Sequence, residues 1–154
     1  MTNQKKVVKK LCNLFNHSEA VLFGRARSAL AGILESIGYS ENSCIIIPAT
    51  ICPSIVSVIN EFGIKIYLAD INPEDGLVDD ECMAKLISSI DTKGIVMICY
   101  LYGIFKKYPK THAKAREKGW FILENDAFSS TAYLHQENPF PLIVLAIIAF
   151  GLSI

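Results

Sequence analysis

The stretch from Cys44 to Asp70 reads CIIIPATICPSIVSVINEFGIKIYLAD and alternates two hydrophobic periods. Its first residues, Cys44–Ile47, form a β-branched run of the kind found in buried strands. Pro53 suits the first position of a helix, and the apolar residues after it recur with helical spacing. Ile64–Ala69 then alternates like a strand. This stretch therefore predicts a strand, a crossover helix and a second strand.

The same alternation continues along the rest of the chain. Helix-like spacing of apolar residues recurs on both sides of the central stretch, and two more strand-like runs follow it. The helical patterns cover residues 29–37, 80–90 and 110–118, and the strand patterns cover residues 94–99 and 120–123. This order predicts βαβ crossovers and a mainly parallel sheet with helices on both faces. We therefore expect one α/β domain, a three-layer sandwich, within the 154 residues.

Composition narrows the class of protein. The 15 Lys and Arg balance the 15 Asp and Glu, so the net charge gives no indication of nucleic acid as a partner. The five cysteines form no C-x-x-C pair, which argues against a zinc site or a disulfide framework and favours reduced thiols. The polar start lacks the apolar region of a secretory signal. Together these features predict a cytoplasmic protein.

The two ends of the chain have contrasting compositions. Lys5, Lys6, Lys9 and Lys10 predict a basic helix within residues 1–20, most simply with the lysines on a solvated face. The apolar residues 141–154 are fewer than the roughly 20 that a membrane-spanning helix needs. We interpret residues 139–154 as an apolar C-terminal strand, and membrane attachment is the weaker alternative.

Three stretches could bind a ligand, because each lies where a strand ends or a helix begins. In the first, Gly24–Leu30, small residues open a helix whose free N–H groups and dipole suit a phosphate, and Ser28 adds a hydroxyl. The stretch matches neither the P-loop nor the dinucleotide-binding fingerprint. The alternative is an ordinary helix start with two solvated arginines, Arg25 and Arg27.

The second stretch centres on Asp126, which follows the predicted strand 120–123. A carboxylate there can pair with a protonated ring nitrogen, as enzymes that use pyridoxal phosphate (PLP) require; a turn or N-cap aspartate is the alternative. Asp70 has the same placement after Ile64–Ala69, but the turn residues behind it favour a structural role. In the third stretch, Cys99–Gly103, Tyr100 could line a pocket or simply pack. The histidines lack the spacing of metal ligands, so no metal site is predicted.

Taken in order, these blocks resemble the DegT-type sugar aminotransferases, which are PLP-dependent enzymes of fold type I. The resemblance covers about residues 20–130, in the blocks Gly24–Leu30, Ile45–Thr50, Gly63–Ile71, Cys99–Gly103 and Ile122–Ala127. It implies a truncated large domain of that fold, PLP as the cofactor, and amino transfer to a keto-sugar nucleotide or a similar carbonyl compound. It also implies a homodimer in intact members.

The same resemblance assigns roles to individual residues. In the family, the first block binds the cofactor phosphate, a role that transfers to Arg27 and Ser28. The aspartate that bonds the pyridine nitrogen corresponds to Asp126. Cys52 falls near the position of the aromatic residue that stacks on the ring, and Ser129 stands where Gln or His is common.

The lysine is the largest departure from the family pattern. The family's Schiff-base lysine follows the aspartate, yet this sequence has no Lys or Arg after Lys118. Ala149–Ile154 resembles the approach to that lysine and stops before it. From the resemblance we expect a truncated enzyme that is inactive as this chain stands. The alternative is a non-catalytic α/β remnant or a partner-binding module.

Overall fold

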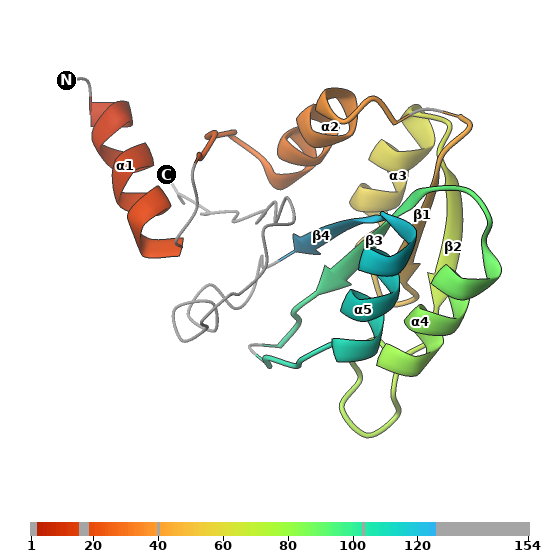
Figure 1. Cartoon of the computed structure of the whole chain (residues 1–154). Coiled ribbons are helices and arrows are strands. Elements are labelled where there is room, and N and C mark those ends of the chain that lie inside the picture. The colour runs from red at the N-terminus through yellow and green to blue at the C-terminus, as the bar shows by residue number, and fades with distance from the viewer. Residues whose placement is uncertain (1–2, 16–18, 40, 103, 126–154) are drawn as a thin grey trace.

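A four-stranded sheet forms the centre of the structure, a computed structural model that describes residues 3–15, 19–39, 41–102 and 104–125 (Figure 1). The strand order is β2-β1-β3-β4, and every neighbouring pair is parallel. The strands are β1 (Cys44–Pro48), β2 (Lys65–Ala69), β3 (Gly94–Cys99) and β4 (Phe121–Asn125). The helices are α1 (Asn3–Phe15), α2 (Ala26–Ser36), α3 (Pro53–Glu61), α4 (Asp80–Ser89) and α5 (Pro109–Lys118). The predicted α/β fold with a parallel sheet is confirmed.

Helices α2 to α5 form two layers, one on each face of the sheet (Figure 1). Buried residues of α2 and α3 share one apolar cluster with Ile45, Met97 and Leu123. Buried residues of α4 and α5 share the second cluster with Ile46 and Val96 on the opposite face of the same strands. All residues of β1 and β3 are buried, because these two strands are covered on both faces and both edges.

The last described strand lies further along the chain than its pattern predicts. The apolar run placed it at residues 120–123, but β4 runs from Phe121 to Asn125. Its ladder with β3 continues past the apolar residues, so that Glu124 pairs with Ile98 and Asn125 pairs with Cys99. Two polar residues therefore complete the strand, because pairing with β3 satisfies their backbone groups. The predicted strand at residues 139–154 lies outside the described residues.

The N-terminal helix α1 stands apart from the sheet and its two helical layers (Figure 1). It contains the four lysines that predicted a basic helix. None of the helices in the described ranges is long and apolar enough to cross a bilayer.

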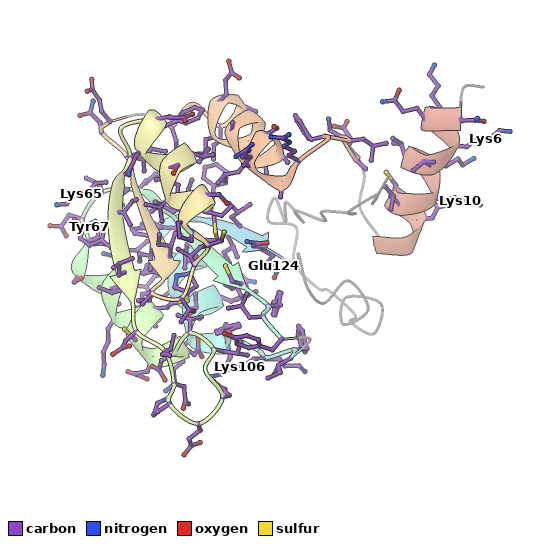
Figure 2. The ribbon with its side chains drawn as sticks, turned by 180° about the vertical axis from the view of Figure 1, so that it is seen from behind. Lys6, Lys10, Lys65, Tyr67, Lys106 and Glu124 are labelled. Atoms are coloured by element: carbon purple, nitrogen blue, oxygen red, sulfur yellow. The ribbon has the colours of Figure 1, made fainter. Side chains whose placement is uncertain are left out.

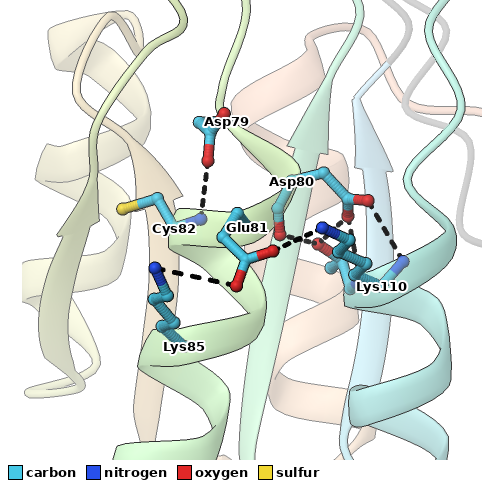
Figure 3. Close-up of polar contacts among 7 residues, drawn as sticks. Asp79, Asp80, Glu81, Cys82, Lys85 and Lys110 are labelled. Atoms are coloured by element: carbon cyan, nitrogen blue, oxygen red, sulfur yellow. Dashed lines mark hydrogen bonds and ion pairs between the residues drawn. The ribbon is translucent and has the colours of Figure 1, made fainter.

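The carboxylate of Asp80 in α4 connects this helix to the neighbouring helix α5 (Figure 3). Asp79 caps its own helix α4 by accepting the Cys82 N–H at 2.7 Å. Asp80 reaches the neighbouring helix α5, which has no side-chain cap of its own. Its Oδ1 accepts the Thr111 N–H at 2.9 Å and the Thr111 hydroxyl at 2.7 Å, and its Oδ2 accepts the Lys110 N–H at 3.1 Å. Asp80 therefore acts as the N-cap of α5 from another helix.

We expect Asp80→Ala to lower the free energy of unfolding by about 1–3 kcal/mol, because the buried Thr111 and two amides of α5 lose their acceptor. Urea denaturation followed by circular dichroism measures the change. Asp91→Ala removes an exposed carboxylate and should stay within about 0.5 kcal/mol of the parent chain. Equal stability of the two variants would show that α5 does not depend on the Asp80 carboxylate.

Candidate functional site

The carboxyl ends of the four strands meet at one edge of the sheet, because all of the strands are parallel. In open α/β sheets, ligands bind outside this edge. The residues that follow the strands there are Ala49 after β1, Asp70 after β2, Tyr100 after β3 and Asp126 after β4. Asp126 itself lies outside the described residues.

Helix α2 begins at this same edge. Tyr39, just after the helix, packs edge-on against Phe121 with ring centroids 5.6 Å apart, and its hydroxyl donates to the Gly94 carbonyl at 3.1 Å. Phe121 and Gly94 are the first residues of β4 and β3, so α2 ends at the amino edge of the sheet. The helix has 11 residues, about 16 Å, which matches the length of a five-residue strand. Its N-terminus therefore lies at the carboxyl edge.

The first turn of α2 is open to a ligand. Arg25 is its N-cap in an extended conformation, with no side-chain hydrogen bond to the turn. The N–H groups of Ser28 and Ala29 donate to the Arg25 carbonyl at 3.1 and 3.2 Å, whereas those of Ala26 and Arg27 have no acceptor among the described residues. Arg25, Arg27 and Ser28 are exposed, and the turn contains no acidic residue. Free amides, a helix dipole and two guanidinium groups suit a phosphate.

Cys52 lies near the same edge, at the N-cap of α3 and four residues after β1 ends. Its thiol is exposed, and Sγ lies 3.2 Å from the Ser54 hydroxyl oxygen. Hydrogen bonds from the Ser54 side chain and backbone lower the pKa of the Cys52 thiol. Cys52 therefore places an exposed thiol with a lowered pKa near the position where the resemblance expects an aromatic ring.

Hydrogen bonds connect the carboxyl ends of β3 and β4. The Tyr100 N–H donates to the Asn125 carbonyl at 3.1 Å. The Tyr100 hydroxyl donates at 3.4 Å to Oε1 of Glu124, the residue labelled near the end of β4 in Figure 2. The ring of Tyr100 stacks on Phe105 with centroids 5.2 Å apart. Burial raises the pKa of the neighbouring Cys99 thiol to about 12. These contacts support the packing interpretation of Tyr100 and fix the strand end that immediately precedes Asp126.

Asp70 has the structural role that its turn predicted. Its Oδ1 accepts the N–H of Ile71 at 2.8 Å, and its carbonyl accepts the N–H of Asp79 at 3.0 Å. Both bonds shape the turn after β2.

The structure thus brings three of the predicted cofactor-binding residues, Arg27, Ser28 and Cys52, to helix starts at one edge of the sheet. Asp126 and Ser129 lie outside the described residues. Sequence patterns missed the pairing of Tyr100 with Glu124, for which a lone glutamate in an apolar strand was the only signal. Within the described ranges, no group of three or more His, Cys, Asp or Glu side chains could hold a metal ion.

A comparison with protein-family models identifies the relatives of this chain. Residues 2–138 match the model of the DegT/DnrJ/EryC1/StrS aminotransferase family. The chain belongs to this family. No curated protein sequence matches this DegT-family chain.

Solved structures share the fold of this DegT-family chain. One neighbour is Spr1654 of Streptococcus pneumoniae, described as a sugar aminotransferase in its PLP form, with 19% identity, a TM-score of 0.75, and coverage of 85% of this chain and 37% of the neighbour. A family aminotransferase of Brucella abortus has 20% identity and a TM-score of 0.71, with coverage of 82% and 35%. GDP-4-keto-6-deoxy-D-mannose-3-dehydratase of E. coli, with bound hydrated PLP, has 16% identity and a TM-score of 0.71, with coverage of 82% and 34%. The DegT-family chain therefore spans little more than a third of these structures.

We expect Cys52 to be alkylated at a lower pH than an ordinary thiol, because the Ser54 hydrogen bonds stabilise the thiolate. Ser54→Ala removes the side-chain bond and should move the midpoint of the rate–pH profile upward. Iodoacetamide labelling with peptide mass spectrometry follows each cysteine, and the buried Cys99 should stay unlabelled below pH 9.

Ser57→Ala is the matched control, because the Ser57 hydroxyl donates to the Pro53 carbonyl in the same helix and not to Cys52. It should leave the Cys52 profile unchanged. An unchanged profile in Ser54→Ala as well would show that Ser54 does not set this pKa.

Proposed function

We propose that this chain forms the phosphate-binding side of a PLP site of the sugar-aminotransferase type. The observation that carries the proposal is the open first turn of α2 at the carboxyl edge of the sheet. There the N–H groups of Ala26 and Arg27 have no acceptor among the described residues, and two exposed arginines flank them. Membership in the DegT/DnrJ/EryC1/StrS aminotransferase family supports the choice of PLP over another phosphorylated ligand.

Each residue of the proposed site has a distinct task. The amides of the first α2 turn, the Ser28 hydroxyl and the Arg27 guanidinium would hold the phosphate dianion. Cys52 would lie on the ring side, and Asp126 would hold the proton on the pyridine nitrogen, with Ser129 beside it. The chemistry that PLP supplies when bound is an electron sink for the amino-group carbon, and it depends on that protonated nitrogen.

The lysines of the described residues are occupied elsewhere or lie on the surface. Lys106 pairs with Asp75 at 2.7 Å, Lys110 pairs with Glu81, and Lys118 donates to the Ser88 and Ile90 carbonyls. None follows Asp126 in the 154 residues. We therefore propose that these 154 residues bind PLP without a Schiff-base lysine of their own and do not transaminate.

For the whole protein, we propose amino transfer to a keto-sugar nucleotide or a similar small carbonyl compound in the cytoplasm, by a homodimer. The supporting observations are the family match and the fold of the sugar-modifying neighbours. The lack of a lysine after Lys118 favours a second candidate for this chain alone, a non-catalytic module that binds PLP or a partner protein.

Equilibrium dialysis tests the proposed site. We expect Arg27→Ala to weaken PLP binding about tenfold, because a charge-assisted hydrogen bond to the phosphate is lost. Pyridoxal, which lacks the phosphate, should bind both proteins equally. With excess glutamate, conversion of PLP to pyridoxamine phosphate should not exceed the rate of the free cofactor.

Lys93→Ala is the control, because Lys93 is also an exposed cation but lies at the amino edge, directly before β3. It should bind PLP like the parent chain. Equal affinity of Arg27→Ala and Lys93→Ala would contradict the phosphate site, and protein-dependent conversion with glutamate would contradict the absence of catalysis.

A further inference from the structure

The N-terminal helix α1 has a basic side and an apolar side that face in opposite directions. At about 100° per residue, four lysines fill one arc of about 140°, and four apolar residues fill the opposite arc. The lysines are Lys5, Lys6, Lys9 and Lys10, and the apolar residues are Val7, Val8, Leu11 and Cys12. No other described helix separates its polar and apolar sides as sharply. This pattern is typical of a helix that lies at a boundary between water and an apolar phase.

The lysine side of α1 is open to solvent. All four lysines are exposed, and Lys6 and Lys10 point away from the sheet domain (Figure 2). The helix itself contains no acidic residue. Across the described part of the chain, the ion pairs involve none of these four lysines. Four positive charges on one side of a 13-residue helix are therefore available to an anionic partner.

The apolar side of α1 is not part of the core of the sheet domain. Among the described residues, neither of the two apolar clusters on the faces of the sheet includes a residue of α1. Val7 is 46% exposed, whereas Val8, Leu11 and Cys12 are half-buried. The helix stands apart from the sheet (Figure 1). The sheet domain therefore does not account for the apolar residues of α1.

A partner that fits α1 has to contact both sides of the helix. A nucleic acid would attract the lysines but would leave the apolar side in water. A bilayer that contains anionic lipids contacts both sides, because its acyl chains lie directly beneath its phosphates. Lys5 and Lys10 lie at the two borders of the apolar side. From there, their long side chains can reach lipid phosphates while the apolar residues insert between the headgroups.

We propose that α1 binds the anionic surface of a phospholipid bilayer, with its apolar side in the headgroup boundary and its lysines on lipid phosphates. At 13 residues, α1 is about 20 Å long, which is shorter than a hydrocarbon core of about 30 Å. The helix therefore lies along the surface and does not cross the bilayer. This contact is independent of the proposed cofactor site.

The charge of the rest of the chain does not cancel the attraction of α1 to such a surface. With the lysines of α1 set aside, the sequence has 11 basic and 15 acidic residues, a small negative excess. Salt at physiological strength screens charges that are more than about 8 Å apart. Because α1 stands apart from the sheet domain, its lysines reach the surface before the acidic residues of that domain do (Figure 1).

Vesicle sedimentation with the full chain tests the contact. The chain should bind phosphatidylcholine vesicles that contain about 30% phosphatidylserine at least about twentyfold more strongly than vesicles of phosphatidylcholine alone. Two bordering lysines at such a surface contribute about fivefold each. The variant Lys5→Gln/Lys6→Gln/Lys9→Gln/Lys10→Gln should lose this difference. Salt at about 0.5 M should also remove most of it, because the attraction is screened.

Two further variants separate the α1 contact from general charge attraction. Lys65→Gln/Lys85→Gln/Lys93→Gln/Lys107→Gln removes the same charge from four exposed lysines of the sheet domain and should bind within about threefold of the parent chain. Val7→Gln/Leu11→Gln keeps every lysine and the helix propensity but removes apolar contact. It should weaken binding at least about tenfold, which a purely electrostatic contact would not show.

Hydrogen exchange followed by mass spectrometry locates the contact on the chain. Anionic vesicles should slow the exchange of amides in residues 3–15 and leave those of α4 and α5 unchanged. This measurement on the parent chain does not depend on the folding of any variant.

Several outcomes would overturn the proposal. Failure of the parent chain to bind anionic vesicles would do so, as would equal binding to vesicles of phosphatidylcholine alone, which would assign attachment to an uncharged apolar segment. Equal losses in the α1 lysine variant and the sheet-domain lysine variant would show attraction without a site. Lysine-dependent binding to single-stranded RNA that exceeds binding to the vesicles at the same salt would assign α1 to nucleic acid instead.

Discussion

The contact between β1 and β3 is the constraint on which the rest of the structure depends. Gly94 opens β3 opposite Cys44, and a Cβ on Gly94 would lie 2.6 Å from Cys44 Sγ and 2.9 Å from the Trp120 ring. Only glycine permits this close approach. It allows the two central strands to pair at Cys44, and it allows the Trp120 ring to pack against Gly94 directly before β4. With β1 and β3 parallel, each connecting helix must run back across the sheet. Helix starts and strand ends therefore gather at one edge, where the candidate site lies.

The carboxyl edge of the sheet contains two thiols whose pKa values are shifted in opposite directions. Cys99 is buried at the end of β3, and burial raises the pKa of its thiol to about 12. Cys52 is exposed at the start of α3, where Ser54 lowers the pKa of its thiol. The difference follows from desolvation in one case and hydrogen bonding in the other. A ligand at this edge would therefore meet the exposed Cys52 thiol and not the buried Cys99 thiol.

The sequence predicted the features that depend on local pattern. Continuous apolar runs predicted the central strands correctly because these strands are buried on both faces, and the small residues of Gly24–Leu30 predicted the open start of α2. Features that depend on distant partners could not be predicted. Asp80 caps a helix some 30 residues away, and Glu124 extends β4 beside Tyr100, 24 residues earlier. The sequence contains no signal for the Asp80 cap, and its one signal for the Tyr100–Glu124 pairing is the lone glutamate in an apolar strand.

The proposed cofactor site requires that the first turn of α2 receives a phosphate beside the end of β4. Amide nuclear magnetic resonance of the full chain, titrated with PLP and with pyridoxal in parallel, can detect this phosphate contact. We expect PLP to shift the amide signals of Ala26, Arg27 and Ser28 together with that of Asp126, and pyridoxal to leave the three α2 signals in place. Shifts confined to other regions, or equal α2 shifts with both compounds, would contradict it.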